Sequence, residues 1–497
     1  MVKLLKQPVV WLIILSCFYV ISRLINLTAL PMFTDEAIYI RWAQIGGRDA
    51  SWRFISLTDG KQPLFTWAMM VSLRLFQDPL FAGRLVSVIS GLLSLIGMYV
   101  LGHEIFRSRR IGVISSILYL ISPFALFYDR LALYDSLVST FFIWNLYLGI
   151  LLVRKIQLDI ALIFGLMLGI GMLNKTSAFL SLYLIPFTLL LFDWKAKQFG
   201  LRLLRFLGLV GISALLSQLV YSILRLSPYF YIIAQKDTIF VYPFSLWITH
   251  PFEFFFGNIR GMFNWLIGYM TWPVFLSTLA SMCIFRKNVR EKALLMLWWF
   301  LPFAALALFG RVLYPRFILF MTMPLLVLSA WMLGELFGRI KNTRIGFLCI
   351  GLICLVSMYI SFGIIVDIKN AHIPRSERGQ YIDDWPSGWG VSEIVKFFQN
   401  ESAKGNISVY TEGTFGLLPY AFEIYLGDNK NIDIHGIWPL PTQMPTDMMQ
   451  RAAEHPAYFV MYQSQAVPFQ WPLKLLYGYQ KGLNKNSTMR LYKITTP

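Results

Sequence analysis

Charged residues are scarce in this chain, and acidic residues are scarcer than basic ones. Of 497 residues, only 14% are Asp, Glu, Lys or Arg, whereas 57% are hydrophobic and 16% are aromatic. A soluble globular chain carries about 25% charged residues, and about 20 consecutive apolar residues are enough to cross a bilayer. The shortage of charge therefore excludes an ordinary soluble enzyme and indicates a polytopic α-helical membrane protein.

Cysteine and histidine are equally sparse. All four cysteines lie in apolar segments, at Cys17, Cys283, Cys349 and Cys354. The polar regions therefore lack both a disulfide framework and a cysteine metal site. The five histidines are scattered without metal-ligand spacing, at His103, His250, His372, His435 and His455.

Long apolar runs, by contrast, fill most of the first 366 residues. Eleven runs bounded by charge or by Gly and Pro predict about eleven transmembrane helices. The first is expected to be a span and not a cleaved signal peptide, because Arg23 and Asn26 follow it without a small-residue cleavage pattern. The runs lie at roughly 9–27, 80–103, 111–128, 136–153, 159–173, 178–193, 206–224, 262–285, 294–310, 316–337 and 345–366.

The net charge of +18 has a topological explanation. Basic residues concentrate in every second loop, which by the positive-inside rule places the N-terminus in the cytoplasm of an inner or plasma membrane and the C-terminal tail outside. This distribution argues against a nucleic-acid partner. The loops in question carry Lys3, Lys6, Arg107, Arg109, Arg110, Arg154, Lys155, Lys195, Lys197, Arg202, Arg205, Arg286, Lys287, Arg290, Lys292, Arg339, Lys341 and Arg344.

Three polar segments are predicted on the outer side. Residues 28–79 form a long loop, and residues 225–261 are rich in aromatic residues, as is typical of an amphipathic segment at the membrane interface. The tail, residues 367–497, alternates short strand and helix patterns, which predicts a small extracytoplasmic α/β domain beside a transmembrane domain of residues 1–366. The expected strands are Ile407–Thr411, Ile432–Gly436, Ala457–Met461 and Met489–Lys493, and the helices are Ser392–Asn400, Leu417–Leu426 and Thr446–Glu454.

Ionisable residues near the predicted outer surface are the candidates for chemistry, because a charge close to the membrane needs a partner or a task. Asp35 and Glu36 follow the first span, where a helix capped by Thr34 or Asp35 is the simpler explanation. Each basic residue nearby, taken singly, is explained as an interfacial anchor. Together they predict a basic collar around a carboxylate, suited to a phosphate group beside a general base: Lys61, Arg130, Lys175, Arg311 and Arg316.

The order of these motifs resembles the C-type (GT-C) membrane glycosyltransferases. The resemblance covers about residues 10–340 and depends on the order and topology of weak motifs. It is greatest to the branch that contains the dolichyl-phosphate-mannose protein mannosyltransferases and the bacterial aminoarabinose transferases of lipid A. The motifs read Asp35-Glu36, Lys61-Gln-Pro-Leu64, Arg130 to Asp135, Gly165-Leu-Met-Leu-Gly169 to Lys175, and Arg316-Phe317.

The resemblance implies a hexosyl- or pentosyltransferase that moves a sugar, with inversion, from a polyprenyl-phosphate carrier to a lipid, glycan or protein acceptor outside the membrane. It assigns acceptor activation to Asp35, with Glu36 as its catalytic neighbour. It assigns the donor phosphate to Lys61, Arg130, Lys175 and Arg316, with Asp135 as the structural orienter of Arg130. Gln62-Pro63 stands where the protein mannosyltransferases have a His-Pro-Pro element, which argues against protein O-mannosylation in particular.

Elementary chemistry agrees with this assignment and leaves alternatives open. Fixed cations can stabilise a phosphate leaving group, and one carboxylate can accept the acceptor's hydroxyl proton, so no cofactor is required. A divalent metal at Asp35 and Glu36 remains an alternative. A ligase or polymerase of lipid-linked oligosaccharides would work at the same surface. A lipid or sugar transporter would instead be expected to show repeats with binding groups at the midplane.

Overall fold

The computed structural model describes residues 8–466, 468 and 470–495, so Lys3 and Lys6 lie outside the described residues. The described chain divides into two compact units. The first contains Met1–Ile25, Phe54–Phe65 and Leu85–Val366, and the second contains Asn26–Arg53, Thr66–Arg84 and Asp367–Pro497. Two stretches of the long first loop therefore cluster with the tail.

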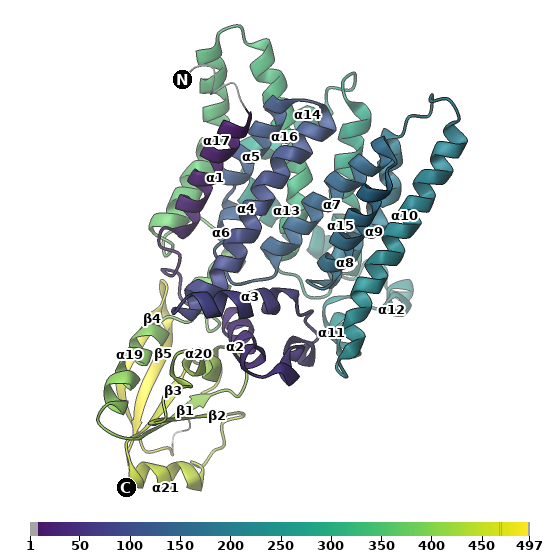
Figure 1. Cartoon of the computed structure of the whole chain (residues 1–497). Helices are drawn as coiled ribbons and strands as arrows, with labels where there is room; N and C mark the ends of the chain where they lie inside the picture. The colour runs from purple at the N-terminus through teal and green to yellow at the C-terminus, as the bar shows by residue number, and fades with distance from the viewer. Residues whose placement is uncertain (1–7, 467, 469, 496–497) are drawn as a thin grey trace. The chain divides into compact units, whose positions relative to one another are not determined.

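The first unit is a bundle of helices (Figure 1). Five predicted runs are each divided between two helical segments, at Ser122, Ile185, Ser222, Thr271 and Leu319. The elements are α1 (Pro8–Leu24), η3 (Ile55–Asp59), α4 (Pro79–Phe106, in this unit from Leu85), α5 (Arg109–Ile121), α6 (Pro123–Tyr128), α7 (Asp135–Lys155), α8 (Leu158–Met172), η4 (Thr176–Ala178), α9 (Phe179–Leu184), η5 (Ile185–Leu191), α10 (Phe199–Tyr221), η6 (Ser222–Leu226), α11 (Ile232–Phe240), α12 (Phe244–Thr249), α13 (Phe255–Met270), α14 (Trp272–Met282), α15 (Val289–Phe309), η7 (Pro315–Ile318), α16 (Leu319–Arg339) and α17 (Thr343–Val366).

Every predicted apolar run coincides with a helix or with such a pair of segments, so the predicted fold class is confirmed. Among the described residues, six helical segments are long and apolar enough to cross a membrane, and six further apolar helices are shorter. The chain is therefore a multi-pass membrane protein. Its orientation in the membrane stays a prediction.

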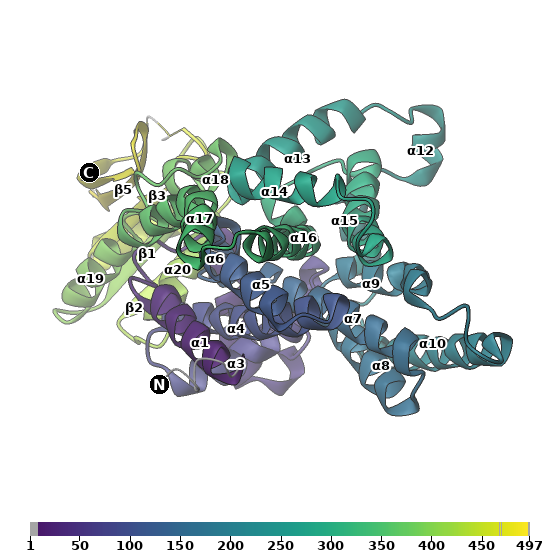
Figure 2. The same cartoon turned by 90° about the horizontal axis from the view of Figure 1, so that it is seen from above.

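Burial separates central helices from peripheral ones. In the most apolar stretch of each segment, 89% of the residues of Pro315–Arg339 and 83% of those of Asp135–Lys155 are buried inside the protein. For Phe199–Leu226 the share is only 17%. Figure 2 shows α16 among α5, α7, α14, α15 and α17, all of which contact it. The exposed apolar faces of α10 and α17 are those expected to meet lipid, since lipid tails satisfy apolar side chains without protein contact.

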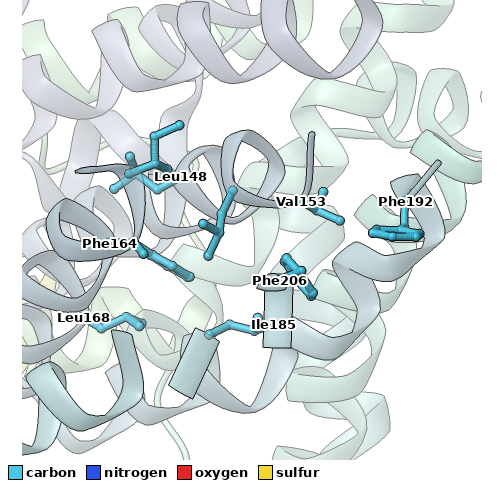
Figure 3. Packing of buried hydrophobic residues seen from close by; sticks show 10 residues of the cluster. Leu148, Val153, Phe164, Leu168, Ile185, Phe192 and Phe206 are labelled. Carbon is cyan, nitrogen blue, oxygen red and sulfur yellow. The ribbon is translucent and has the colours of Figure 1, made fainter. Parts of the chain in front are cut away.

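Helices α7, α8, η5 and α10 share one hydrophobic cluster (Figure 3). Leu148 and Val153 of α7 pack with Phe164 and Leu168 of α8, and Ile185 and Phe206 complete the cluster. Helices α8 and α10 approach closely because Gly165 and Gly169 face Ser213, Ser217 and Val220. The Gly-x-x-x-Gly motif is thus a helix-packing motif, as is common in membranes.

The second unit contains a five-stranded mixed sheet with strand order β2-β1-β3-β5-β4. Strand β1 is parallel to β2 and β3, and β5 is antiparallel to β3 and β4. The elements are α2 (Thr34–Arg48), η2 (Ala50–Trp52), α3 (Leu64–Leu75, in this unit from Thr66), α18 (Arg375–Arg378), η8 (Gly379–Asp383), α19 (Val391–Ser402), β1 (Ile407–Glu412), α20 (Leu417–Leu426), β2 (Ile432–Ile437), α21 (Thr446–Glu454), β3 (Ala457–Met461), β4 (Leu473–Lys481) and β5 (Asn484–Ile494).

Helix α2 is fastened to the α/β part of the same unit by its polar face. Arg41 pairs with Glu423 at 2.7 Å, and Arg48 pairs with Asp428 at 2.6 Å. The main chain at Phe33 and Ser387 also forms a β-bridge. Residues Asn26–Arg53 and the tail therefore belong to one structural unit, although Arg53 and Asp367 are more than 300 residues apart in the sequence.

Candidate functional site

The predicted site residues fall into both compact units. The carboxylates Asp35 and Glu36 belong to the second unit, and the remaining candidates belong to the first: Lys61, Arg130, Asp135, Lys175 and Arg316.

Lys61 is presented by a tight turn. The 3₁₀ helix η3 ends at Gly60, whose φ of +67° lies in the left-handed region that favours glycine. The turn is closed by the Lys61 amide, which donates to the Ser56 carbonyl at 2.9 Å. The Lys61 ammonium lies 5.3 Å from the ring centroid of Phe240, at the end of α11. This distance is that of a cation–π contact.

Lys175 follows α8 and is held by a buried acid. Its ammonium donates to Asp135 Oδ1 at 2.6 Å and lies 4.7 Å from the ring centroid of Phe317. Asp135 is the first residue of α7, where the positive end of the helix dipole favours a carboxylate. Asp135, which the sequence analysis expected to orient Arg130, therefore holds Lys175 in place.

Arg316 lies in η7 beside the same aromatic residues. Its guanidinium carbon is 4.8 Å from the Tyr314 ring and 6.0 Å from the Phe317 ring. The rings of Phe317 and Phe240 are themselves 5.9 Å apart. Contacts through these rings therefore join three of the four predicted phosphate residues into one basic cluster: Lys61, Lys175 and Arg316 around Phe240 and Phe317.

Arg130 contacts the end of α1. Its Nη1 donates to the carbonyls of Ser22 and Ile25, at 3.0 and 2.8 Å. The role of Asp135 as the orienter of Arg130 stays a prediction. Arg130 follows Asp129, which is buried and accepts hydrogen bonds from Tyr19 and Tyr119.

The sequence analysis missed Asp237, which lies on α11 beside the basic cluster. Burial raises the pKa of Asp237, whereas the charge of Lys61 and a hydrogen bond with Thr176 oppose this shift. Thr176 in turn accepts a hydrogen bond from Gln62 Nε2 at 2.7 Å. The signal available in the sequence was a Lys-Asp pair, Lys236-Asp237, within an otherwise aromatic outer segment.

Glu36 is fully buried and engaged by Arg84. Arg84 Nε donates to Glu36 Oε1 at 2.8 Å and Nη2 to Oε2 at 2.7 Å, so the pair is bidentate. Glu36 Oε2 also accepts the amide of Phe33 at 2.9 Å, which makes Phe33 the N-cap of α2. Helix α2 therefore begins at Thr34 with Phe33 as its cap, not with Thr34 or Asp35 in that position.

Asp35 occupies the first turn of α2 and is partly exposed. The bidentate Glu36–Arg84 pair fixes the backbone from which Asp35 projects. A metal ion at Glu36 would compete with this guanidinium. Over residues 8–466, 468 and 470–495, no group of three or more His, Cys, Asp and Glu residues could hold a metal ion.

Comparisons with known proteins agree with the resemblance inferred from the motifs. Residues 60–247 match the family described as dolichyl-phosphate-mannose-protein mannosyltransferase. No curated protein matches the chain significantly.

Solved structures show the fold. ArnT from Cupriavidus metallidurans, in the apo state, is 13% identical with a TM-score of 0.61, over 97% of each chain. The same protein bound to undecaprenyl phosphate gives a TM-score of 0.62 at 13% identity, over 97% of this chain and 98% of that chain. The oligosaccharyltransferase of Archaeoglobus fulgidus gives 0.54 at 14% identity, over 92% of this chain and 69% of that chain.

Proposed function

We propose that this chain, which has the fold of the C-type (GT-C) membrane glycosyltransferases, transfers a sugar from a polyprenyl-phosphate carrier. The acceptor is a hydroxyl group at the outer face of the membrane. The observation that carries the proposal is the basic cluster, in which Lys61 contacts the Phe240 ring while Lys175 and Arg316 contact the neighbouring Phe317 ring. Three cations gathered at one place suit an anionic ligand. The match to ArnT, whose structure was solved with undecaprenyl phosphate, supports a lipid phosphate as that ligand.

The basic cluster serves the departure of the phosphate. When the bond between the sugar and the phosphate breaks, negative charge grows on the phosphate oxygens, and fixed cations stabilise that charge more in the transition state than in the ground state. Lys175 is held in place by Asp135, and Lys61 is presented by the Gly60 turn, so both cations are preorganised. Arg130 is assigned to the same anion as a further phosphate-side base.

Asp35 is proposed as the general base that accepts the proton of the acceptor hydroxyl. One carboxylate is sufficient for a single displacement with inversion, because the phosphate leaves without protonation. Glu36 acts through its ion pair with Arg84, which holds the first turn of α2, and is therefore a positioning residue. The donor sugar is a hexose or pentose, and the acceptor is a lipid, glycan or protein.

Binding of undecaprenyl phosphate to the detergent-solubilised chain tests this proposal. We expect Lys61→Met to weaken binding about tenfold or more, because a charge-assisted contact with phosphate is lost. Lys155→Met is the matched control, since Lys155 is exposed and is the last residue of α7, at the end opposite Asp135. Equal affinity of the wild type and both variants would contradict the assignment of the phosphate site.

A further inference from the structure

Helix α11 brings a carboxylate into the basic cluster. Asp237 lies within the electrostatic reach of Lys61 and shares a hydrogen bond with Thr176. Three residues later, the ring of Phe240 contacts both the Lys61 ammonium and the Phe317 ring. The acid and the phosphate-binding cations therefore belong to one local structure.

The position of α11 is fixed at both of its ends. At its start, a Cβ added at Gly60 would lie 2.9 Å from the Ile232 carbonyl oxygen, and at its middle Lys236 pairs with Asp59 at 2.5 Å. At its end, the Phe240 carbonyl accepts the amide of Arg311 at 2.8 Å. These contacts fix the helix that carries Asp237 beside the turn that presents Lys61.

A carboxylate in this place opposes the binding of a bare phosphate. Two like charges a few ångströms apart repel strongly in a partly buried site, where the effective dielectric constant is about 20. Asp135 neutralises Lys175 through a direct ion pair, so a second acid is not needed to balance that lysine. The repulsion between Asp237 and the phosphate is offset if the bound molecule brings hydrogen-bond donors beside its phosphate.

We propose that Asp237 is a specificity-determining residue that accepts hydrogen bonds from the hydroxyl groups of the donor sugar. This inference rests on the proposed function, because it takes the basic cluster to be the site of the carrier phosphate. The sugar is attached directly to that phosphate, so its hydroxyl groups lie within a few ångströms of the cations. Asp237 thereby favours the loaded carrier and repels the discharged carrier, which assists product release.

Two binding measurements test the inference. Undecaprenyl phosphate and undecaprenyl phosphate carrying a hexose or a pentose are titrated separately into the purified full chain. We expect Asp237→Asn to bind bare undecaprenyl phosphate about 3- to 10-fold more tightly, since a like charge is removed. We expect it to bind the better of the two sugar-loaded lipids about tenfold more weakly, since a charge-assisted acceptor is lost.

Two further variants keep the inference falsifiable. Asp237→Glu retains the charge but shifts the carboxylate, so it should weaken binding of the sugar-loaded lipid while leaving the bare lipid as weakly bound as in the wild type. Glu253→Gln removes an exposed carboxylate of the same outer segment and should change neither affinity. Parallel changes for both lipids in Asp237→Asn, or no change in either, overturn the role of Asp237. A wild-type chain that binds neither lipid overturns the proposed function itself.

Discussion

Asp35 and Glu36 are neighbours in the chain, yet their surroundings separate their roles. Glu36 is fully buried and shares both oxygens with Arg84, so its charge is satisfied within the protein. Breaking a buried ion pair by removing one partner typically costs several kcal/mol. Asp35 is partly exposed on the same turn, and for this reason we propose it, and not Glu36, as the general base.

We expect Asp35→Asn to lower the transfer rate about 10²- to 10⁴-fold, because amides do not act as general bases. Binding of the carrier lipid should persist. Turnover of the purified variant with a polyprenyl-phosphate sugar checks this, with Asp49→Asn at the exposed end of α2 as the matched control. Undiminished turnover in Asp35→Asn would remove Asp35 from the mechanism.

The sequence singles out candidate residues but not their partners. Lys61, Lys175 and Arg316 are conspicuous because they are charges beside a membrane span. Their partners depend on tertiary structure: Asp135 meets Lys175 across 40 residues, and Glu36 meets Arg84 across 48. Asp237 was missed because its interaction with Lys61, which is distant in the sequence, depends on tertiary structure.

At the scale of elements, the packing of α8 on α10 depends on the absence of side chains. A Cβ at Gly169 would lie 2.6 Å from Val220 Cβ and 3.0 Å from the Ser217 carbonyl oxygen. We expect Gly169→Leu to destabilise the chain by about 1–3 kcal/mol through overpacking.

Gly208→Leu is the matched control for this substitution, because no atom lies within 4 Å of a Cβ built there on α10. The thermal midpoint in detergent should fall for Gly169→Leu and stay near the wild-type value for Gly208→Leu. Equal midpoints for the two variants would show that close packing at Gly169 is not required.

Strand β4 ends in a buried lysine whose protonation is linked to stability. Burial lowers the pKa of Lys481 to about 7, against the opposing charges of Glu412 and Asp384. In the unfolded chain a lysine has a pKa of about 10.4. Between these values the unfolded state binds a proton that the folded state does not, so stability rises with pH from about 7 to about 10.

We therefore expect the thermal midpoint of the chain to rise between pH 7 and pH 9 more in the wild type than in Lys481→Met, where this contribution is absent. Circular dichroism of both proteins at several pH values measures the difference. Parallel curves for the two proteins would rule out a depressed pKa for Lys481.

Element prediction succeeded where the pattern was local. Helix α20 and strand β3 begin and end at the predicted residues, because flanking Gly and Pro residues mark their limits. Strand β4 was missed, since it contains Gly478 and a register shift between Leu475 and Tyr477. Glycine and bulges weaken the strand pattern in a sequence.

At the scale of the whole molecule, the membrane orientation underlies every functional claim. The positive-inside rule places the basic loop after α14 in the cytoplasm and the tail outside. Single cysteines at Arg286 and Asn406, both exposed, are suitable probes once the four native cysteines are replaced. With an impermeant thiol reagent on intact cells, we expect labelling at Asn406 and protection at Arg286; the reverse pattern would invert the orientation.

Incubation of the purified chain with a polyprenyl-phosphate sugar tests the central claim most directly, by chromatography of the extracted lipids and of the acceptor. The proposed function predicts free polyprenyl phosphate together with sugar on an acceptor, and neither product with Asp35→Asn. Donor lipid recovered unchanged, or moved intact across a vesicle bilayer by the wild-type chain, would contradict glycosyl transfer and favour transport.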